Sequence, residues 1–309
     1  MARDPVDVLL YNPSFDGWPD PDPSPCAVPC SFTTDRARLR DADAVVFHVP
    51  TLQEPLPTVK PRGQHWVAWS MESEVTTPVL ADPGFMQQFD LTMTYRRDAD
   101  VWVPYLGAGT IRALQAPPLP KTADRPVCHF QSNPYDRSGR TAYTAALLRR
   151  VKINSYGAVL PTVAEPGRVC GRDARLAVMA RHKFTLAFEN SVATDYVSDK
   201  FFDALIAGSV PVYLGAPEVA DFAPAARSYI DTADFSGPAE LAAYLNHLDG
   251  DDEEYTTYLS WRREDLDARF VELVSRATRD PFLRLAELLH ARRLNPTAPR
   301  GSGASPAPR

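Results

Sequence analysis

The sequence predicts an α/β protein with parallel sheets, and two observations carry that expectation. Short apolar runs alternate with helix-like segments along the second half of the chain, which is the order that produces parallel sheets. These runs are mostly unbroken, as in strands buried on both faces. With 309 residues, of which 44% are hydrophobic, the chain can bury a sizeable core in one large or two ordinary domains. Ligands of such sheets bind at the carboxyl ends of the strands.

The first half contains four apolar runs that predict strands: Val6–Tyr11, Ala44–His48, Trp66–Ser70 and Leu91–Tyr95. The connections between them are rich in proline, because 19 of the 30 prolines fall in residues 1–134. Asp16–Ser31 is rich in Pro and Asp and is predicted to be a loop. Pro117–Pro126 is predicted to be a linker, so we place a domain boundary between residues 122 and 123.

The second half alternates predicted strands with predicted helices and forms a second domain, 123–293. The predicted strands are Val127–Gln131, Ile153–Tyr156, Phe184–Phe188 and Val210–Leu214. The predicted helices are Arg140–Arg150, Arg172–Arg181, Asp199–Ala207, Pro238–Leu248, Glu253–Ser275 and Asp280–Arg293. Ser198 occupies an N-cap position and Gly208 follows the end of the same helix. Residues 294–309 have low complexity and are predicted to be disordered.

Charge and hydropathy exclude several classes of protein. A formal net charge of −6 leaves no basic excess for binding nucleic acid. No apolar run approaches the ~20 residues that cross a bilayer, and the N-terminus lacks the features of a signal peptide, so we expect a cytoplasmic protein without a transmembrane segment. The apolar face of the final helix, 280–293, predicts docking onto the body of the protein, with weak contact to a membrane surface as the alternative. The cysteines lack metal spacing and are expected to be thiols: Cys26, Cys30, Cys128 and Cys170.

The densest group of chemically active residues lies in Lys183–Pro217, KFTLAFENSVATDYVSDKFFDALIAGSVPVYLGAP. The predicted order is a buried strand, a polar loop, a capped helix and a second strand. The free N–H groups and partial positive charge at a helix N-terminus favour a phosphate or carboxylate, and Lys200 adds a full charge there. Asp199 could accept hydrogen bonds from the two hydroxyls of a ribose. Taken in isolation, Asp199 would only favour the helix dipole and Lys200 would be a solvated surface residue.

The segment FENS…DYVSDKFFDALIAGSVPVYLGAP resembles the donor-site motif of the α-1,3-fucosyltransferases, glycosyltransferase family 10. Further blocks resemble the family in the same order: HWVAWSMESE, FDLTMTYRRDADVWVPY, SNPYDRSGRTAYTAAL with INSYG, and the stretch that ends in YTTYLSWR. The resemblance covers roughly residues 65–263. Because the chain shows no membrane anchor, it resembles the soluble bacterial members in particular.

The resemblance implies an inverting transferase of the GT-B type, with two Rossmann-like domains facing a central cleft. The first domain would hold a glycan acceptor such as an N-acetyllactosamine unit, and the second would hold GDP-fucose, the co-substrate. The product would carry an α-1,3 or α-1,4 linkage. Alternatives are another GDP-sugar, a natural-product or polysaccharide acceptor, or a catalytically silent sugar-binding protein. The proline-rich Pro13–Pro29 loop is our candidate for acceptor selectivity.

For the catalytic base, the resemblance points to Glu72, which matches the glutamate of the family's ESP segment. Glu74 stands where the family has proline and is the alternative base. Asp98 and Asp100 form a D-x-D, which binds Mn²⁺ in other transferases. In this family the nucleotide is not held through that motif, so we expect the two aspartates to form a structural network with neighbouring arginines.

For the leaving diphosphate, Arg140 matches the family arginine, with Arg137 as its competitor, and Lys200 would be the second cation. Two side-chain cations would make a metal ion unnecessary. Asp199 stands where the family has Glu, which shortens the carboxylate arm and could alter donor choice. Three further residues match donor-site positions of the motif: Glu189, Asn190 and Tyr196.

Overall fold

The computed structural model describes residues 5–107, 109–164 and 169–294. The chain divides into two compact units, which we describe separately. Unit 1 comprises residues 1–104 together with 279–309, and unit 2 comprises residues 105–278. The division therefore lies elsewhere than the predicted boundary between residues 122 and 123, and the C-terminal helix belongs with the first unit. The tail predicted to be disordered falls outside the described residues, except for Leu294.

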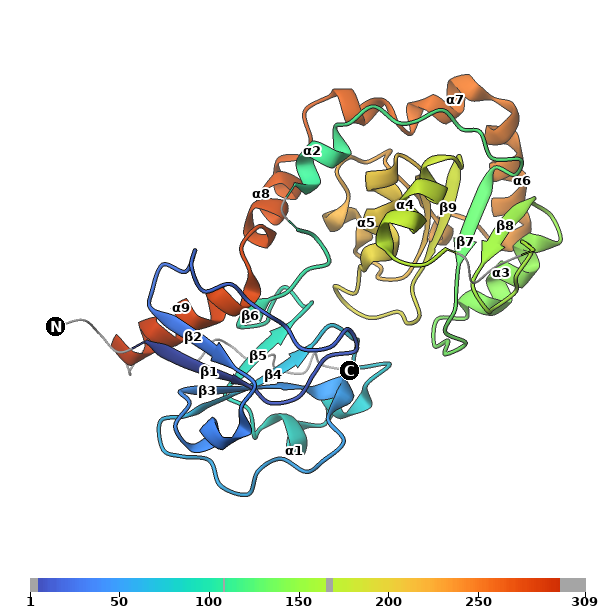
Figure 1. The fold of residues 1–309 in the computed structure, drawn as a ribbon. Coiled ribbons are helices and arrows are strands. Elements are labelled where there is room, and N and C mark those ends of the chain that lie inside the picture. The colour runs from blue at the N-terminus through green and yellow to red at the C-terminus, as the bar shows by residue number, and fades with distance from the viewer. Residues whose placement is uncertain (1–4, 108, 165–168, 295–309) are drawn as a thin grey trace. The chain divides into compact units, whose positions relative to one another are not determined.

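Unit 1 is built on a six-stranded sheet whose paired strands are all parallel (Figure 1). The strand order is β2 (Cys30–Thr33), β1 (Val6–Leu10), β3 (Ala44–His48), β4 (His65–Ser70), β5 (Leu91–Thr94) and β6 (Val101–Trp102). The four predicted strands are confirmed. The two outer strands were not predicted, because β2 is only partly buried and β6 has only two residues.

Both faces of this sheet are covered by apolar side chains, which explains the unbroken runs in the sequence. Helix α9 (Pro281–Leu294) packs on one face, where Phe282, Leu285, Ala286 and Leu289 join the core. The predicted docking of this helix is confirmed, and its apolar face is too buried to contact a membrane surface. Leu9, Tyr11, Val45, Phe47 and Trp66 form a cluster on the opposite face, and a short helix, α1 (Pro83–Met86), lies between β4 and β5 in the chain.

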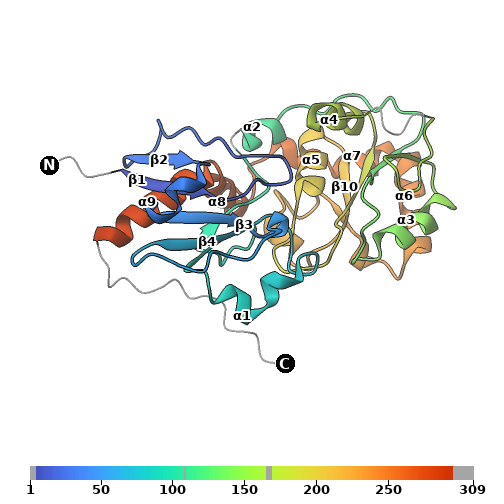
Figure 2. The same cartoon turned by 60° about the horizontal axis from the view of Figure 1, so that its bottom comes forward.

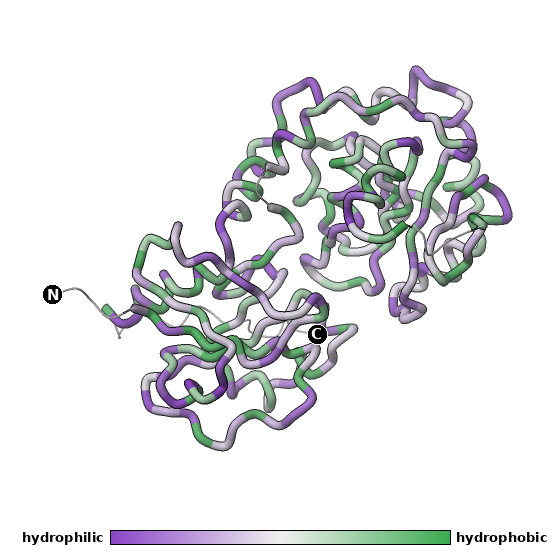
Figure 3. The backbone as a smooth tube through the Cα atoms, viewed as in Figure 1, coloured by the Kyte–Doolittle hydropathy of each residue, from purple (hydrophilic) through white to green (hydrophobic). Residues whose placement is uncertain are grey.

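Unit 2 contains a five-stranded parallel sheet. The strand order is β11 (Ile230–Asp231), β10 (Val210–Leu214), β9 (Phe184–Phe188), β7 (Val127–Phe130) and β8 (Ile153–Tyr156). Its helices are α2 (Thr110–Leu114), α3 (Arg140–Leu148), α4 (Arg172–Ala180), α5 (Asp199–Ala207), α6 (Pro238–Gly250), α7 (Asp252–Thr257) and α8 (Ala268–Ala277). Helices α3 and α6 lie side by side (Figure 2), and the central strands carry hydrophobic residues, green in Figure 3.

Two predictions in unit 2 are wrong for identifiable reasons. The helix predicted over Glu253–Ser275 is divided into α7 and α8 by residues 258–267. This interruption contains a 3-10 turn, Ser260–Arg263, in which Trp261 and Arg262 are buried. The segment predicted to be a linker is anchored within unit 2, because the Lys121 ammonium donates to the Ala180 and Gly208 carbonyls at 2.9 and 2.6 Å. Within the described residues, the helices are all too short or too polar to span a bilayer.

Candidate functional site

A cavity of about 340 Å³ opens at the carboxyl edge of the unit 2 sheet. Phe130 ends β7, Tyr156 ends β8, and the first residues of α5 complete the wall, so the cavity lies where parallel sheets bind ligands. The rings of Phe130 and Tyr156 are stacked, with centroids 4.9 Å apart. A larger hollow of about 640 Å³ beside α2 and α8 has Arg112 as its single charged lining residue within the described chain. Two further hollows, of about 550 and 410 Å³, also have charged lining residues, but they are lined mainly by residues that precede β7 and β8. The position at the carboxyl edge of the sheet therefore singles out the 340 Å³ cavity, which is lined by Phe130, Ser132, Tyr156, Gly157, Val169, Cys170, Arg175, Met179, Thr185, Leu186, Asp199, Lys200 and Asp203.

Glu189 is fully buried directly after β9 and organises the start of α5. Its Oε1 accepts from the Ser198 backbone N–H at 2.7 Å, and its Oε2 accepts from the Ser198 hydroxyl at 2.8 Å. The Lys200 ammonium donates to the same Oε2 at 3.0 Å and to Ser198 Oγ at 2.8 Å. Ser198 is the N-cap of α5, as predicted. A buried carboxylate thus holds both the cap and the lysine in place.

Lys200 keeps its positive charge in this setting. Burial lowers the pKa of its ammonium, but the negative charges of Glu189 and Asp199 outweigh that effect, so the net pKa is raised. The Lys200 side chain remains 29% exposed and lines the cavity. It is therefore a permanent cation that a ligand in the cavity can reach.

Arg140 is buried, and its guanidinium reaches the end of β9. It donates to the Phe188 carbonyl at 3.2 Å and to the Asn133 and Tyr135 carbonyls at 3.4 and 3.3 Å. The charge of Arg140 acts on Lys200, opposing the rise in the pKa of that lysine. The competing Arg137 has an exposed side chain that lies on the Tyr135 ring, with its Nε 3.0 Å from the tyrosine hydroxyl. The structure thus brings Arg140, rather than Arg137, toward Glu189 and Lys200.

Asp199 has a partner that the sequence did not reveal. Its Oδ2 accepts from Arg175 Nη2 at 3.1 Å, and its Oδ1 lies 3.9 Å from the Lys200 ammonium. Arg175 also lies 3.5 Å from Asp203, a buried carboxyl whose pKa is raised by burial although Arg172 pairs with it at 2.7 Å. Arg175 is in α4, which lies between the blocks that resemble the family, so nothing in the sequence marked it.

The remaining two predicted donor-site residues lie close in the chain but differ in exposure. Asn190 is half-buried, and its backbone carbonyl accepts from the Arg137 N–H at 2.7 Å. Tyr196 is almost completely buried, with its ring 6.3 Å from that of Tyr105 and its carbonyl accepting from the Tyr213 hydroxyl at 3.2 Å. The Tyr196 ring therefore packs in the interior of unit 2 and is absent from the residues that line the cavity.

The two candidate bases lie in unit 1, just past the carboxyl end of β4. Glu72 is half-buried, and its Oε2 accepts from the Thr76 hydroxyl at 3.1 Å. Glu74 accepts from the Tyr95 hydroxyl at 2.6 Å. The hydrogen bonds to Asp98 are the main cause of the raised pKa of Arg96, and the charge of Glu74 adds to that rise. The two carboxylates thus have different settings: Glu74 is drawn toward a tyrosine and a cation, and Glu72 toward a neutral hydroxyl.

The D-x-D motif is engaged within unit 1. Asp98 accepts two hydrogen bonds of 2.9 Å from Arg96, in a bidentate pair. Asp100 accepts from the Thr92 N–H at 2.9 Å and pairs with Arg292 of α9 at 3.3 Å. The predicted network is therefore present in part, and the second aspartate ties the sheet to α9 instead of to its sequence neighbours.

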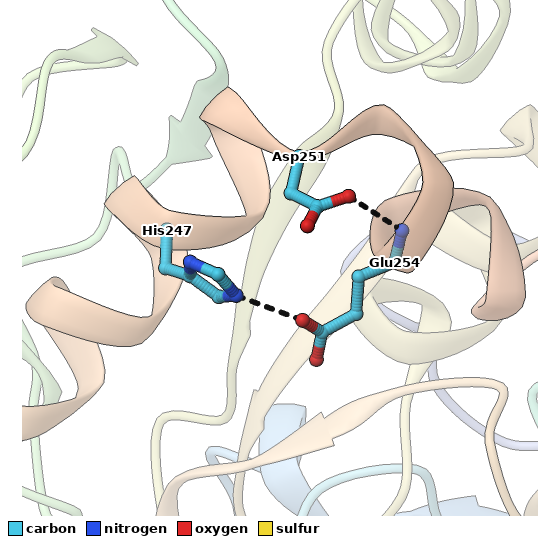
Figure 4. A group of neighbouring side chains, drawn as sticks. All are labelled: His247, Asp251 and Glu254. Carbon is cyan, nitrogen blue, oxygen red and sulfur yellow. Dashed lines mark hydrogen bonds and ion pairs between the residues drawn. The ribbon is translucent and has the colours of Figure 1, made fainter.

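One cluster within the described residues has the composition of a metal site (Figure 4). His247, Asp251 and Glu254 each offer a ligand atom within 4.8 Å of the others. Asp251, however, caps α7 by accepting from the Glu254 N–H at 2.9 Å, and Glu254 accepts from His247 Nε2 at 2.8 Å. Arg227 also lies 3.9 Å from Glu254. Hydrogen bonds and a neighbouring cation account for this cluster, which belongs to α6 and α7 and not to the cavity.

Comparison with protein families covers nearly the whole chain. Residues 120–297 match the model described as glycosyltransferase family 10 (fucosyltransferase) C-term. Residues 3–106 match the model described as fucosyltransferase, N-terminal. The first of these regions along the chain ends at residue 106, close to the boundary between residues 104 and 105 that separates the units, and the second begins at residue 120.

The chain is similar to named relatives over most of its length. It is 32% identical over 241 residues to 4-galactosyl-N-acetylglucosaminide 3-alpha-L-fucosyltransferase 9 from Rattus norvegicus, a match that covers 76% of this chain and 64% of the relative. It is 36% identical over 241 residues to alpha-(1,3)-fucosyltransferase 7 from Mus musculus, covering 75% of this chain and 58% of the relative. The chain thus spans less than two thirds of either relative.

Solved structures reveal the same architecture. The crystal structure of an alpha1,3-fucosyltransferase with GDP-fucose matches with a TM-score of 0.62 at 16% identity, covering 97% of this chain and 93% of that chain. The structure of an alpha1,3-fucosyltransferase with GDP matches equally well, with a TM-score of 0.62 at 15% identity. At this identity the likeness defines the fold, which is the predicted GT-B type with two Rossmann-like units. Because one family model alone covers more than half of its residues, the chain belongs to glycosyltransferase family 10.

Proposed function

We propose that this chain transfers L-fucose from GDP-fucose to a hydroxyl of a glycan acceptor, with inversion and with an α-1,3 or α-1,4 linkage. The family membership supports this activity, as do the relatives, whose names describe a 3-alpha-L-fucosyltransferase and an alpha-(1,3)-fucosyltransferase. The similar alpha1,3-fucosyltransferase structure with GDP-fucose supports the donor. An N-acetyllactosamine unit is the acceptor that the name of the first relative suggests.

One observation carries the proposal: the Lys200 ammonium lines the unit 2 cavity beside the N-terminus of α5, and it lies within the influence of Arg140, whose guanidinium is buried against the Phe188 carbonyl. The leaving GDP gains negative charge as the sugar–phosphate bond breaks, so fixed cations there stabilise the transition state more than the ground state. The helix N-terminus adds partial positive charge. Two cations and a helix terminus offer the charge that a metal ion supplies elsewhere, and we propose that no divalent metal is required.

In the proposed reaction, an acceptor hydroxyl attacks the anomeric carbon of fucose on the face opposite GDP. The new glycosidic C–O bond forms while the bond from that carbon to the diphosphate oxygen breaks, and GDP leaves with the electron pair. Glu72 takes the hydroxyl proton. Its position past the end of a parallel strand supports this role, as does its match to the glutamate of the family's ESP segment.

A second candidate is the same reaction with another GDP-sugar. Asp199 is the observation that favours it, because it stands where the family has Glu and its carboxylate is bound to Arg175 at 3.1 Å, so the donor site departs from the family pattern at this position. Transfer assays with a panel of GDP-sugars distinguish the two donors, and GDP binding without turnover of any of them would identify a silent sugar-binding protein.

The direct test incubates the protein with GDP-fucose and N-acetyllactosamine and determines the product linkage by NMR. Lys200→Ala and Glu72→Ala are each expected to lower kcat by at least ~100-fold. Lys152→Ala, which removes an exposed lysine of unit 2, is the matched control and should keep full activity. If Lys200→Ala and Glu72→Ala both retain wild-type rates, the site assignment is wrong.

A further inference from the structure

Two large aromatic side chains are exposed in the connection between β1 and β2 of unit 1. Phe15 is 68% exposed and Trp18 is 46% exposed, although they are separated by only two residues. Single exposed hydrophobic residues are ordinary on protein surfaces, but two large exposed rings in one short segment make that segment a candidate binding surface. Tryptophan is also the residue most enriched where binding energy concentrates.

The backbone around these rings is held in one shape. Ser14 and Gly17 exchange two backbone hydrogen bonds of 2.8 and 3.1 Å, and the turn needs a glycine because φ at Gly17 is +102°. Just before the turn, the Asn12 side chain donates to the His48 carbonyl at 2.9 Å and accepts from the His48 N–H at 3.0 Å. The turn is thereby fixed to the end of β3.

The Phe15 ring is itself supported from below by a row of aromatic rings. It meets His48 edge to face at 5.5 Å, His48 meets Trp69 at 4.7 Å, and Trp69 meets Phe282 of α9 at 5.3 Å. His48 and Trp69 are buried. Phe15 is therefore the outermost of four aromatic rings in contact, and the inner rings belong to the core. These contacts hold the Phe15 ring in its exposed position.

This exposed pair lies at the edge of the sheet that also carries the proposed base. β1, β3 and β4 are parallel, so their carboxyl ends meet at one edge. Asn12 follows β1, His48 ends β3, and Glu72 follows β4 at that edge. Figure 1 shows the dark blue connection from β1 running past the strand ends before it returns to β2.

We propose that Phe15 and Trp18, with the adjacent exposed carboxylates of Asp16 and Asp20, form a platform that binds a pyranose ring of the acceptor glycan. A pyranose has an apolar face of C–H groups and a rim of hydroxyls. Aromatic rings bury the first, and carboxylates accept hydrogen bonds from the second. Pro13 and Pro19 limit the freedom of the segment before binding, which lowers the ordering cost. This inference rests on the proposed function, since it names where that reaction's acceptor is held.

The test measures acceptor and donor steps separately in the full chain. Phe15→Ala and Trp18→Ala are each expected to raise KM for N-acetyllactosamine about tenfold, which corresponds to the loss of one good contact. Hydrolysis of GDP-fucose without acceptor should stay unchanged, and Trp18→Phe should recover most of the acceptor affinity. Val59→Ala is the matched control, because Val59 is 62% exposed in the same unit but precedes β4, at the amino edge of the sheet.

Saturation-transfer NMR with N-acetyllactosamine, galactose and N-acetylglucosamine gives a readout that needs no turnover. If the wild type neither hydrolyses GDP-fucose nor binds GDP, the proposed function is wrong. The platform is still supported in that case if the wild type binds a glycan and Trp18→Ala does not. Unchanged acceptor KM in both alanine variants overturns it, as does a wild type that binds none of the three sugars. A change in sedimentation without a change in glycan binding would overturn it in favour of contact between copies of the chain.

Discussion

At the scale of single residues, Glu189 positions the groups at the start of α5 that border the cavity in unit 2. It has no exposure to solvent, and its carboxylate is stabilised by Ser198 and Lys200. A buried charge that loses its partner becomes costly, because desolvation is no longer compensated. The same contacts hold the Lys200 ammonium at the cavity wall, so stability and donor binding are linked through one ion pair.

Lys200→Met is therefore expected to lower the free energy of unfolding by ~3 kcal/mol and to weaken GDP binding. The double variant Glu189→Gln/Lys200→Met removes the unpaired charge, so it should recover part of the stability but none of the GDP affinity. Chemical denaturation measures the first quantity and calorimetric titration with GDP measures the second. A single variant as stable as the wild type would contradict the proposed dependence of Glu189 on Lys200.

Gly215, just after β10, leaves room for the side chains of Tyr213 and Glu189. A Cβ there would come closest to Tyr213 Oη, and it would lie 2.6 Å from Tyr213 Cζ and 2.7 Å from Glu189 Cγ, closer than side chains tolerate. Gly215→Ala is expected to cost ~2 kcal/mol of stability and to weaken GDP binding, because Tyr213 and Glu189 must both move. Gly250→Ala is the matched control, since a Cβ there meets nothing within 4 Å. Equal thermal stability of the two variants would show that both side chains are free to shift.

These residues could be predicted from the sequence only where a local pattern of strand, cap and helix indicates their position. Glu189 and Lys200 stand at the ends of a buried strand and a capped helix, so the local pattern placed both at a strand's carboxyl edge. Arg175 could not be found this way, because its partner Asp199 is 24 residues away and the pair exists only after α4 and α5 pack. The burial of Tyr196 was equally hidden, since it depends on rings such as Tyr105, which is distant in sequence.

At the scale of elements, Arg262 joins the helices behind the site. Its guanidinium donates to the Leu205 carbonyl of α5 at 2.7 Å and to the Ala113 and Ala116 carbonyls at and beyond the end of α2, at 3.2 and 2.8 Å. Burial lowers the pKa of Arg262 to about 10. The last carbonyls of a helix lack partners within the helix, so one buried cation satisfies two helix ends at once.

Arg262→Met should leave these buried carbonyls unsatisfied and lower the urea midpoint, at a cost of ~3 kcal/mol. Arg262→Lys is expected to recover only part of the lost stability, because a single ammonium cannot reach the carbonyls of both helix ends. The neighbouring Arg263 is exposed, so Arg263→Met serves as the matched control with little change. A midpoint for Arg262→Met that equals the control would exclude this bracing role.

The sequence predicted elements well where one local pattern decides them. Unbroken apolar runs such as Ala44–His48 became central strands, and the Ser198 cap with Gly208 gave both ends of α5. The edge strand β2 was missed because CSFT is neither continuously apolar nor strictly alternating. The apolar face of the final helix predicted that the helix docks onto the protein. An apolar face does not indicate which sheet the helix covers, so its position in unit 1 became known only from the structure.

At the scale of the whole molecule, each unit buries a neutral histidine. Burial lowers the pKa of His48 in unit 1 from 6.5 to about 4. In unit 2, burial and then the charge of Arg140 lower the pKa of His129 from 6.5 to about 4. Below pH 6.5 the unfolded chain takes up protons that the folded chain does not, so the free energy of unfolding falls as the pH falls toward 4.

Both units are therefore expected to lose stability over this acid range. His48→Gln and His129→Gln should each flatten the dependence of the melting temperature on pH, and the double variant should flatten it further, even if each variant is less stable at neutral pH. Thermal scans from pH 4 to 7 measure the slopes. Slopes identical to that of the wild type would show that other groups set the acid sensitivity, such as His65 and His182, whose pKa values burial also lowers.

The path of the chain through its two units has a consequence for biosynthesis. Unit 2 is inserted into unit 1, whose sheet receives α9 only after residues 105–278 have been made. At ~5–20 residues per second on the ribosome, the apolar face that α9 covers stays open for on the order of 10–30 seconds. During that interval the inserted unit can fold by itself, while the first sheet presents Val8, Val46 and Val67 to chaperones or to other nascent chains. A circular permutant that begins at residue 279 and ends at 278 would deliver the helix first and shorten that exposure.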